Sequence, residues 1–195
     1  MTPKLSKKNA HYTTNDQITM LDSLITSKTR VKLLMKFFIN SNTTGYLRNL
    51  ASEFGESTNG LRQELNHLED AKLIEAETVQ NKKIYQANTS HPYFEDIHRL
   101  LLKYVGIDRI VEDLVKQIGH LEKAFIINDF AQGKPGNIID LILVGYDFDD
   151  AYLNLLVKKT ESSVSFKIKY ITVEPDELPQ YIQDKTKTLL VWSAN

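Results

Sequence analysis

The chain has 195 residues, of which 42% are hydrophobic and 25% are charged, proportions that are ordinary for a globular protein. It contains no cysteine, which excludes disulfides, thiolate metal ligands and cysteine nucleophiles. No stretch approaches the roughly 18 consecutive apolar residues that a membrane span needs, and no apolar region follows the basic residues near the N-terminus. We therefore expect a cytoplasmic protein without membrane contacts.

The net charge of −1 conceals a difference between the two halves of the chain. Residues 1–90 hold 12 Lys and Arg against 9 Asp and Glu, whereas residues 91–195 hold 12 against 16. A mildly basic N-terminal half beside an acidic C-terminal half indicates a local surface for a polyanion rather than a generally basic protein.

The N-terminal half begins with a polar arm over residues 1–20, which lacks periodicity. Ser27 is placed to cap a helix whose apolar residues recur at helical spacing as far as Phe38. Residues 46–55 predict a second, shorter helix, and its last residue is a glycine that ends it. We expect the domain that these helices open to cover residues 21–90.

A third helix follows Ser57 or Thr58, either of which is a favourable cap. Two strands, 73–79 and 82–88, come after it and flank a polar turn at Gln80–Asn81. The predicted order is therefore helix, helix, tight turn, helix and hairpin. In a helix–turn–helix this order lets the last helix lie in the major groove of DNA.

The third helix has the two faces that a DNA-reading helix needs. Leu61, Leu65 and Leu68 form its inner stripe, which leaves polar side chains on the outer face. Arg suits guanine, and Asn or Gln suits adenine, through paired hydrogen bonds to base edges. The residues that we expect to contact DNA are Ser57, Thr58, Asn59, Arg62, Gln63 and Asn66, together with Arg48 on the preceding helix and Lys82 and Lys83 in the hairpin.

These segments resemble, in order, the winged helix–turn–helix of ArsR-type bacterial transcription regulators. The matching stretches are "SKTRVKLLMKFF", "YLRNLASEFG", "GLRQELNHLEDAKLI" and "NKKIYQAN". Two positions depart from the pattern: Glu56 stands where an apolar residue is usual, and Gly60 weakens the helix by roughly 1 kcal/mol relative to Ala. The resemblance implies a DNA-binding regulator that works as a homodimer on double-stranded DNA, since paired half-sites multiply discrimination.

The second half changes from helices to an alternation of helices and strands. Helices near residues 90–105 and 108–118 form a connector over 91–119, which we expect to carry the dimer contact. Strands follow at 123–129, 138–145, 165–175 and 186–194, with a helix after the acidic cluster at 147–150. We expect an α+β chain in which residues 120–195 form a small α/β domain with a mixed sheet.

Residues 128–145, "NDFAQGKPGNIIDLILVG", resemble the phosphate-binding turn and metal-binding strand of nucleotidyltransferases of the polymerase-beta type. Minimal domains of this family follow an ArsR-like winged helix in some bacterial regulators. In the family a Gly-Ser turn precedes two aspartates spaced i and i+2, which project to one face and hold divalent metal. Ala131, Gly133, Asp140 and Leu141 match that pattern.

Other positions in this segment lack the residues that the chemistry requires. Ile138 replaces the first aspartate, and Asp129 puts negative charge where phosphate would bind. We therefore expect no catalytic residues, metal ligands or cofactor, and a helix-capping role for Asp129. The same turn and strand remain a candidate site for a nucleotide or another small-molecule ligand, formed by Asn128, Asp129, Gln132 and Asp140.

The leading hypothesis is a sequence-specific DNA-binding transcriptional regulator with a catalytically degenerate nucleotidyltransferase-like domain for sensing or interaction. One alternative is a divergent nucleotidyltransferase that modifies a protein or RNA. Another is an antitoxin-like adaptor that uses both domains for protein contacts. Fold resemblance alone does not choose among these functions.

Overall fold

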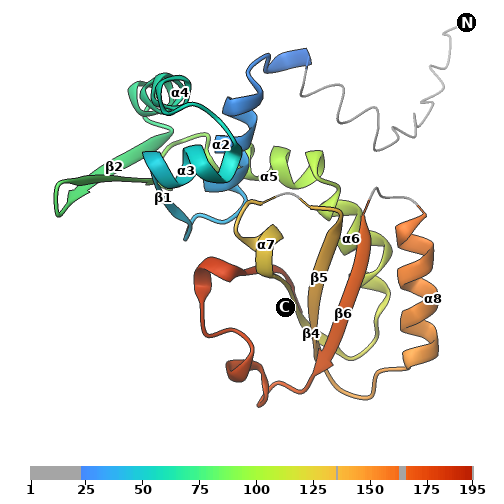
Figure 1. Ribbon diagram of the computed structural model, residues 1–195. Coiled ribbons are helices and arrows are strands. Elements are labelled where there is room, and N and C mark those ends of the chain that lie inside the picture. Colours follow the sequence, from blue (N-terminus) through green and yellow to red (C-terminus); the bar gives the residue numbers. More distant parts are fainter. Residues whose placement is uncertain (1–22, 135, 163–165, 195) are drawn as a thin grey trace, which may run out of the picture.

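The computed structural model describes residues 23–134, 136–162 and 166–194 (Figure 1). Its first half holds three helices, α2 (Lys28–Phe38), α3 (Leu47–Phe54) and α4 (Thr58–Asp70), and a sheet of three short strands, β1 (Thr44–Tyr46), β2 (Ile74–Val79) and β3 (Lys82–Ala87). The predicted order of helix, helix, turn, helix and hairpin is confirmed. Only β1 has no counterpart in the sequence prediction.

The helix boundaries follow from their capping residues. The hydroxyl of Ser27 accepts a hydrogen bond from the backbone N–H of Arg30, and Ser57 does the same for Gly60. Gly55 ends α3 in the left-handed region with a φ of 66°, a conformation that glycine adopts without steric cost. The tight turn between α3 and α4 is therefore encoded locally in the sequence.

The strand order in this sheet is β1-β3-β2, with antiparallel pairing throughout. Gln80 and Asn81 join β2 to β3 with φ values of 48° and 62°, so the hairpin turn has two left-handed residues. Strand β1 pairs with β3 through Gly45, where an added Cβ would lie 2.8 Å from the side chain of Leu50. This close approach explains why a glycine holds the position.

The connector consists of α5 (Phe94–Tyr104), α6 (Ile107–Asp113) and a 3-10 turn, η1 (Val115–Gln117). Gly106 separates the two helices with a φ of 78°, as its place in the sequence predicts. The α-helix expected over 108–118 is shorter, because its last turn is 3-10. Apolar side chains of both helices, including Leu101 and Ile110, are buried in the chain's own core.

The second half contains a four-stranded sheet in the order β6-β5-β4-β7, with strands β4 (Leu121–Ile127), β5 (Ile138–Gly145), β6 (Lys167–Val173) and β7 (Thr188–Ser193). The β5–β6 pair is parallel and the other two pairs are antiparallel, so the predicted mixed sheet is confirmed. Helix α7 (Asn128–Ala131) follows β4, α8 (Asp150–Glu161) follows β5, and the 3-10 turns η2 (Leu178–Gln180) and η3 (Lys185–Lys187) precede β7.

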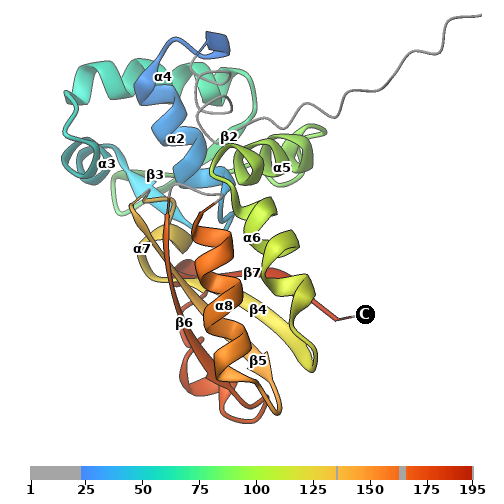
Figure 2. The same ribbon diagram turned by 90° about the vertical axis from the view of Figure 1, so that its right-hand side faces the viewer.

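Apolar side chains are buried on both faces of this sheet. Helices α6 and α8 lie against one face (Figure 2), where Leu141 and Leu143 of β5 join a hydrophobic core that also contains Phe38 of α2. Ile142 and Val144 point to the opposite face and pack with Leu178 in a second, smaller core. Because one core runs through residues of both halves, the N-terminal helices and the sheet domain are packed together.

Candidate nucleic-acid interface

Helix α4 presents the two faces that its sequence predicts. Leu61, Leu65 and Leu68 are buried against the core. The exposed residues on the opposite side are Thr58, Asn59, Arg62, Gln63 and Asn66. Ser57 belongs to the end of the helix, since its hydroxyl accepts from the N–H of Gly60. The hydroxyl hydrogen of Ser57 remains able to donate, so the capping role is compatible with the predicted contact with DNA.

Two contacts of Glu64 hold α4 on α2. The Glu64 carboxylate accepts a hydrogen bond of 2.7 Å from the Ser27 hydroxyl and one of 2.8 Å from Nε of Arg30. Burial favours the protonated form of Glu64, but the hydrogen bonds from Ser27 and Arg30 outweigh it and lower the pKa of the carboxyl. The charged carboxylate thus stabilises the orientation of the outer face of α4.

The turn between α3 and α4 is held by Lys32 of α2. Its ammonium group donates to the carbonyl of Phe54 and to the Glu56 carboxylate, both at 2.9 Å. The hydrogen bond from Lys32 and the charge of that lysine lower the pKa of Glu56. Glu56 departs from the ArsR-like pattern, and in this structure it pairs with Lys32. The same ammonium group donates a hydrogen bond to the backbone carbonyl of Phe54 at the end of α3.

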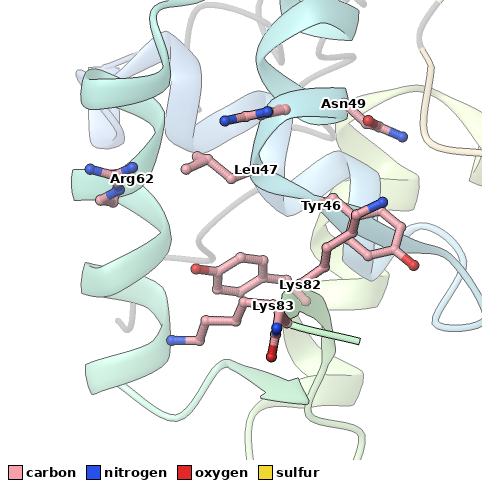
Figure 3. A pocket seen from close by; sticks show the side chains of 9 residues that line it. Tyr46, Leu47, Asn49, Arg62, Lys82 and Lys83 are labelled. Atoms are coloured by element: carbon pink, nitrogen blue, oxygen red, sulfur yellow. The ribbon is translucent and has the colours of Figure 1, made fainter. Parts of the chain in front are cut away.

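A groove of about 640 Å³ opens between the start of α3, the outer side of α4 and the hairpin (Figure 3). It brings together four of the cations predicted to contact DNA, although they come from three separate segments. Its lining residues are Tyr46, Leu47, Arg48, Asn49, Arg62, Asn81, Lys82, Lys83 and Tyr85. The other five lining residues are not among the predicted contacts: Tyr46, Leu47, Asn49, Asn81 and Tyr85. Of these, only Asn81 carries a local signal, which is its position in the hairpin turn.

The cationic side chains of this groove differ in whether other residues of the protein already bind them. Among the described residues, no hydrogen bond or ion pair involves Arg48 or Arg62, and both side chains are exposed. The ammonium group of Lys82 lies 5.9 Å from the ring centroid of Tyr46. Cation–π contact at this distance orients a lysine without neutralising its charge.

Lys83 is instead paired with a carboxylate of α4. Its ammonium group donates a hydrogen bond of 2.7 Å to the Glu69 carboxylate of α4 and lies 5.2 Å from the ring centroid of Tyr85. The hydrogen bond to Glu69 is the main reason that the pKa of Lys83 is raised. Of the two hairpin lysines, Lys82 is therefore the one whose charge is available to a phosphate.

The candidate ligand site in the second half is only partly assembled. Asn128 has a φ of 64°, and its side-chain amide donates a hydrogen bond of 3.3 Å to the Asp140 carboxylate. Both residues line an open cavity of about 540 Å³ with Lys169, Tyr170 and Asn154 among its other walls. Neither Asp129 nor Gln132 lines it. The Asp140 carboxylate on β5 therefore accepts a hydrogen bond at the rim of this cavity.

The capping role expected of Asp129 is wrong. The residue before α7 is Ile127, and no side chain caps that helix. The Asp129 side chain is 79% exposed and lies 3.9 Å from the ammonium group of Lys134. The short helix begins at Asn128, one residue before Asp129, so Asp129 falls within its first turn instead of preceding it.

Neighbouring strands place a cation beside Asp140. In the parallel pairing of β5 and β6, Asp140 is opposite Lys169, and Ile138 is opposite Lys167. Residues that are opposite each other share one face of a sheet. No group of three or more His, Cys, Asp or Glu that could hold a metal ion occurs among the residues that the structure describes.

No helix in the described part of the chain combines the length and apolar character needed to cross a bilayer.

Comparison with known proteins gives no assignment from sequence. No protein-family model matches the chain, and no curated protein matches it significantly. The similar solved structures include a toxin–antitoxin assembly with AMP-PNP, at 18% identity and a TM-score of 0.38, over 46% of this chain and 75% of that chain. They also include the antimony-specific transcriptional repressor AntR, at 18% identity and a TM-score of 0.34, over 60% of this chain and 97% of that chain.

A third similar structure is that of a proposed nucleotidyltransferase from Sulfolobus solfataricus, at 17% identity and a TM-score of 0.34, over 47% of this chain and 82% of that chain. TM-scores below 0.5 do not establish a common fold. The functional argument therefore rests on the residues of the groove.

Proposed function

We propose that this protein is a sequence-specific DNA-binding transcriptional regulator, whose residues 21–90 form a winged helix–turn–helix. In this proposal α4 enters the major groove, the hairpin of β2 and β3 is the wing, and residues 120–195 form a nucleotidyltransferase-like domain. That domain serves as a sensor or an interaction module. Double-stranded DNA is the partner of the groove.

One observation carries the proposal: Arg62 projects from the outer face of α4 into a groove that it shares with Arg48 and Lys82. Guanidinium and ammonium groups that have no hydrogen-bond or ion-pair partner in the described chain are suited to phosphates and to guanine edges. The polar residues beside Arg62 on α4 can pair with further bases. Contacts of both kinds on one surface are what a DNA reader needs.

We further propose that the second domain does not transfer nucleotides. Asp140 is engaged by the amide of Asn128 and has Lys169 as its neighbour on the next strand, so its surroundings differ from a pair of metal-binding carboxylates. Ile138 has no atom that can ligate metal. Incubation with labelled ATP and Mg²⁺ should leave the protein and candidate partners unlabelled. Labelling that Asp140→Asn abolishes would reverse this proposal.

The DNA proposal is tested with duplexes selected from a random-sequence pool by the wild-type protein. Binding of the selected duplex and of an unrelated duplex is then measured by fluorescence anisotropy for the wild type and for Arg62→Ala. Loss of one good base contact should weaken binding to the selected duplex by roughly 1–3 kcal/mol and relax the sequence preference.

Arg99→Ala is the matched control, because Arg99 is an exposed arginine on α5 outside the groove. It should bind like the wild type. If the pool yields no enriched duplex, or if Arg62→Ala and Arg99→Ala bind alike, the assignment of α4 as the reading helix is wrong. Retention of a single protein partner without any DNA affinity would support the adaptor alternative.

A further inference from the structure

The two sheets of the molecule have four edge strands, and they differ in how they are protected from pairing with another chain. Strand β1 is three residues long, β2 carries Glu75 and Glu77, and β6 carries Lys167 and Lys169. Short length and charged side chains are the usual means by which a sheet edge avoids association. Strand β7, "TLLVWS", has neither of these two features, and its one irregularity is a shift of register against β4 between Leu190 and Trp192.

Strand β7 is also incompletely covered. It is bonded to β4 alone, which leaves the backbone groups along its other edge unpaired by any strand in the described chain. None of its six residues is buried, and the side chain of Leu190 is 51% exposed. Exposed leucine on an unpaired strand favours addition of another strand.

The start of β7 is not available in this way. The amide of Asn40, two residues beyond α2, donates a hydrogen bond of 3.2 Å to the carbonyl of Thr188, so that carbonyl is already engaged. The stretch from Leu189 to Ser193 remains. It contains no charge, and its other large side chains, Leu189, Val191 and Trp192, pack partly on the main core.

We propose that residues 189–193 of β7 pair antiparallel with the same residues of a second copy of this chain. A strand edge is complementary to itself about a two-fold axis, and such a contact closes as a dimer. Because this stretch is uncharged, self-pairing brings no like charges together, whereas self-pairing of β6 would bring lysines of the two copies together. The contact would continue the sheet through both copies and cover Leu190.

This interface differs from the connector, which is where the sequence predicts the dimer contact. The large apolar residues of α5 and α6 are mostly turned into the core, with Leu100 still 39% exposed. The inference does not require DNA binding, although a dimer would supply the second reader that paired half-sites need. The two proposals can therefore fail separately.

The test compares three single substitutions to lysine by size-exclusion chromatography with light scattering at micromolar concentration. The wild type should have twice the mass of the 22.4 kDa chain. Leu190→Lys should be monomeric, because self-pairing of β7 would then bring lysines of two copies together, as it would for β6. Leu155→Lys on α8, at a leucine that is 60% exposed, should stay dimeric, and so should Leu100→Lys.

A second measurement does not depend on disrupting the strand. Since the chain has no cysteine, Leu190→Cys carries a single thiol, which a short bismaleimide should link between copies; Leu155→Cys should not be linked. A monomeric wild type overturns the inference. A dimer that survives Leu190→Lys but not Leu100→Lys also overturns it, and places the contact on the connector.

Discussion

The side-chain amide of Asn40, at the end of α2, donates a hydrogen bond of 2.9 Å to the carbonyl of Ala131, which lies 91 residues further along the chain. The same amide donates to the carbonyls of Lys185 and Thr188 at 3.1 and 3.2 Å. Its oxygen accepts from the backbone N–H of Asn42. One side chain that is only 2% exposed therefore joins the N-terminal helices to two segments of the sheet domain.

Asn40→Ala should destabilise the whole chain. Removal of the amide leaves carbonyls of both segments without their donor in a buried place, and each loss of this kind costs roughly 1–3 kcal/mol. We expect the free energy of unfolding, measured by urea denaturation, to fall by at least about 2 kcal/mol. Asn154→Ala, which removes an exposed amide from α8, is the control and should change stability little. Equal stabilities of the two variants would show that this joint is unimportant.

Gly133 forms the second close contact between the halves. A Cβ added there would lie 2.5 Å from Cα of Lys36 and 2.6 Å from the carbonyl oxygen of Met35, and the φ of Gly133 is 69°. Both atoms belong to the backbone of α2, so they cannot rotate away. Gly133→Ala should lower the free energy of unfolding by about 3 kcal/mol, from overpacking and from the left-handed backbone together.

Gly136→Ala provides the matched comparison for this glycine. It lies three residues later, is exposed, and has no atom within 4 Å of an added Cβ. Its midpoint of thermal unfolding should stay within a few degrees of the wild type, since a surface substitution changes stability by about 0.5 kcal/mol or less. A similar loss of stability in both variants would show that any substitution in this loop is destabilising, and that the contact of Gly133 with α2 is not the cause.

The sequence predicts the local features well, because their causes are local. Ser27 and Ser57 cap the helices that follow them, Gly55 ends α3, and Gln80–Asn81 form the hairpin turn. Each of these positions is marked by a residue type with a specific backbone or hydrogen-bonding preference. The helical spacing of Leu61, Leu65 and Leu68 likewise determines which face of α4 is buried and which is exposed.

The features that the sequence did not reveal depend on partners far along the chain. Strand β1 exists because Gly45 pairs with Tyr85, and three residues leave no periodic pattern. Asn40 reads only as a polar residue after a helix, although it joins the two halves. The ion pair of Lys83 with Glu69 arises from the packing of the hairpin on α4, so neighbouring lysines could not be distinguished beforehand.

The difference between Lys82 and Lys83 should appear in the salt dependence of DNA binding. If Lys82 contacts one phosphate, Lys82→Ala should weaken binding to all sequences and reduce the slope of log affinity against log salt by about 0.9. Lys83→Ala should leave that slope nearly unchanged, because its charge is engaged by Glu69. The slopes are measured by anisotropy titrations between low and physiological salt, and a larger effect of Lys83→Ala would contradict the assignment.

A half-buried carboxyl on α6 should make stability depend on pH. Oδ1 of Asp108 is shielded from solvent and has no hydrogen-bond partner among the described residues, and burial is the main reason that the pKa of Asp108 is raised. The backbone N–H and charge of Arg109 and the charge of Lys103 act in the opposite direction, while Glu112 adds to the rise. The folded protein therefore binds this proton more tightly than the unfolded chain does.

The sign of the effect follows from that difference. The stabilising contribution of protonated Asp108 is fully present below the unfolded pKa of about 3.9 and is lost as the pH rises through the higher folded value. Asp108→Asn, which stays neutral, should be more stable than the wild type at pH 7, and the gap should close in acid. Glu64→Gln should behave oppositely, because the pKa of Glu64 is lowered and its contribution is present at neutral pH. Both trends are measured by urea denaturation of the wild type and the two variants from acidic pH to pH 7. A wild type that is more stable than Asp108→Asn at pH 7 would contradict the prediction, because it would show that the folded protein stabilises the charged carboxylate of Asp108.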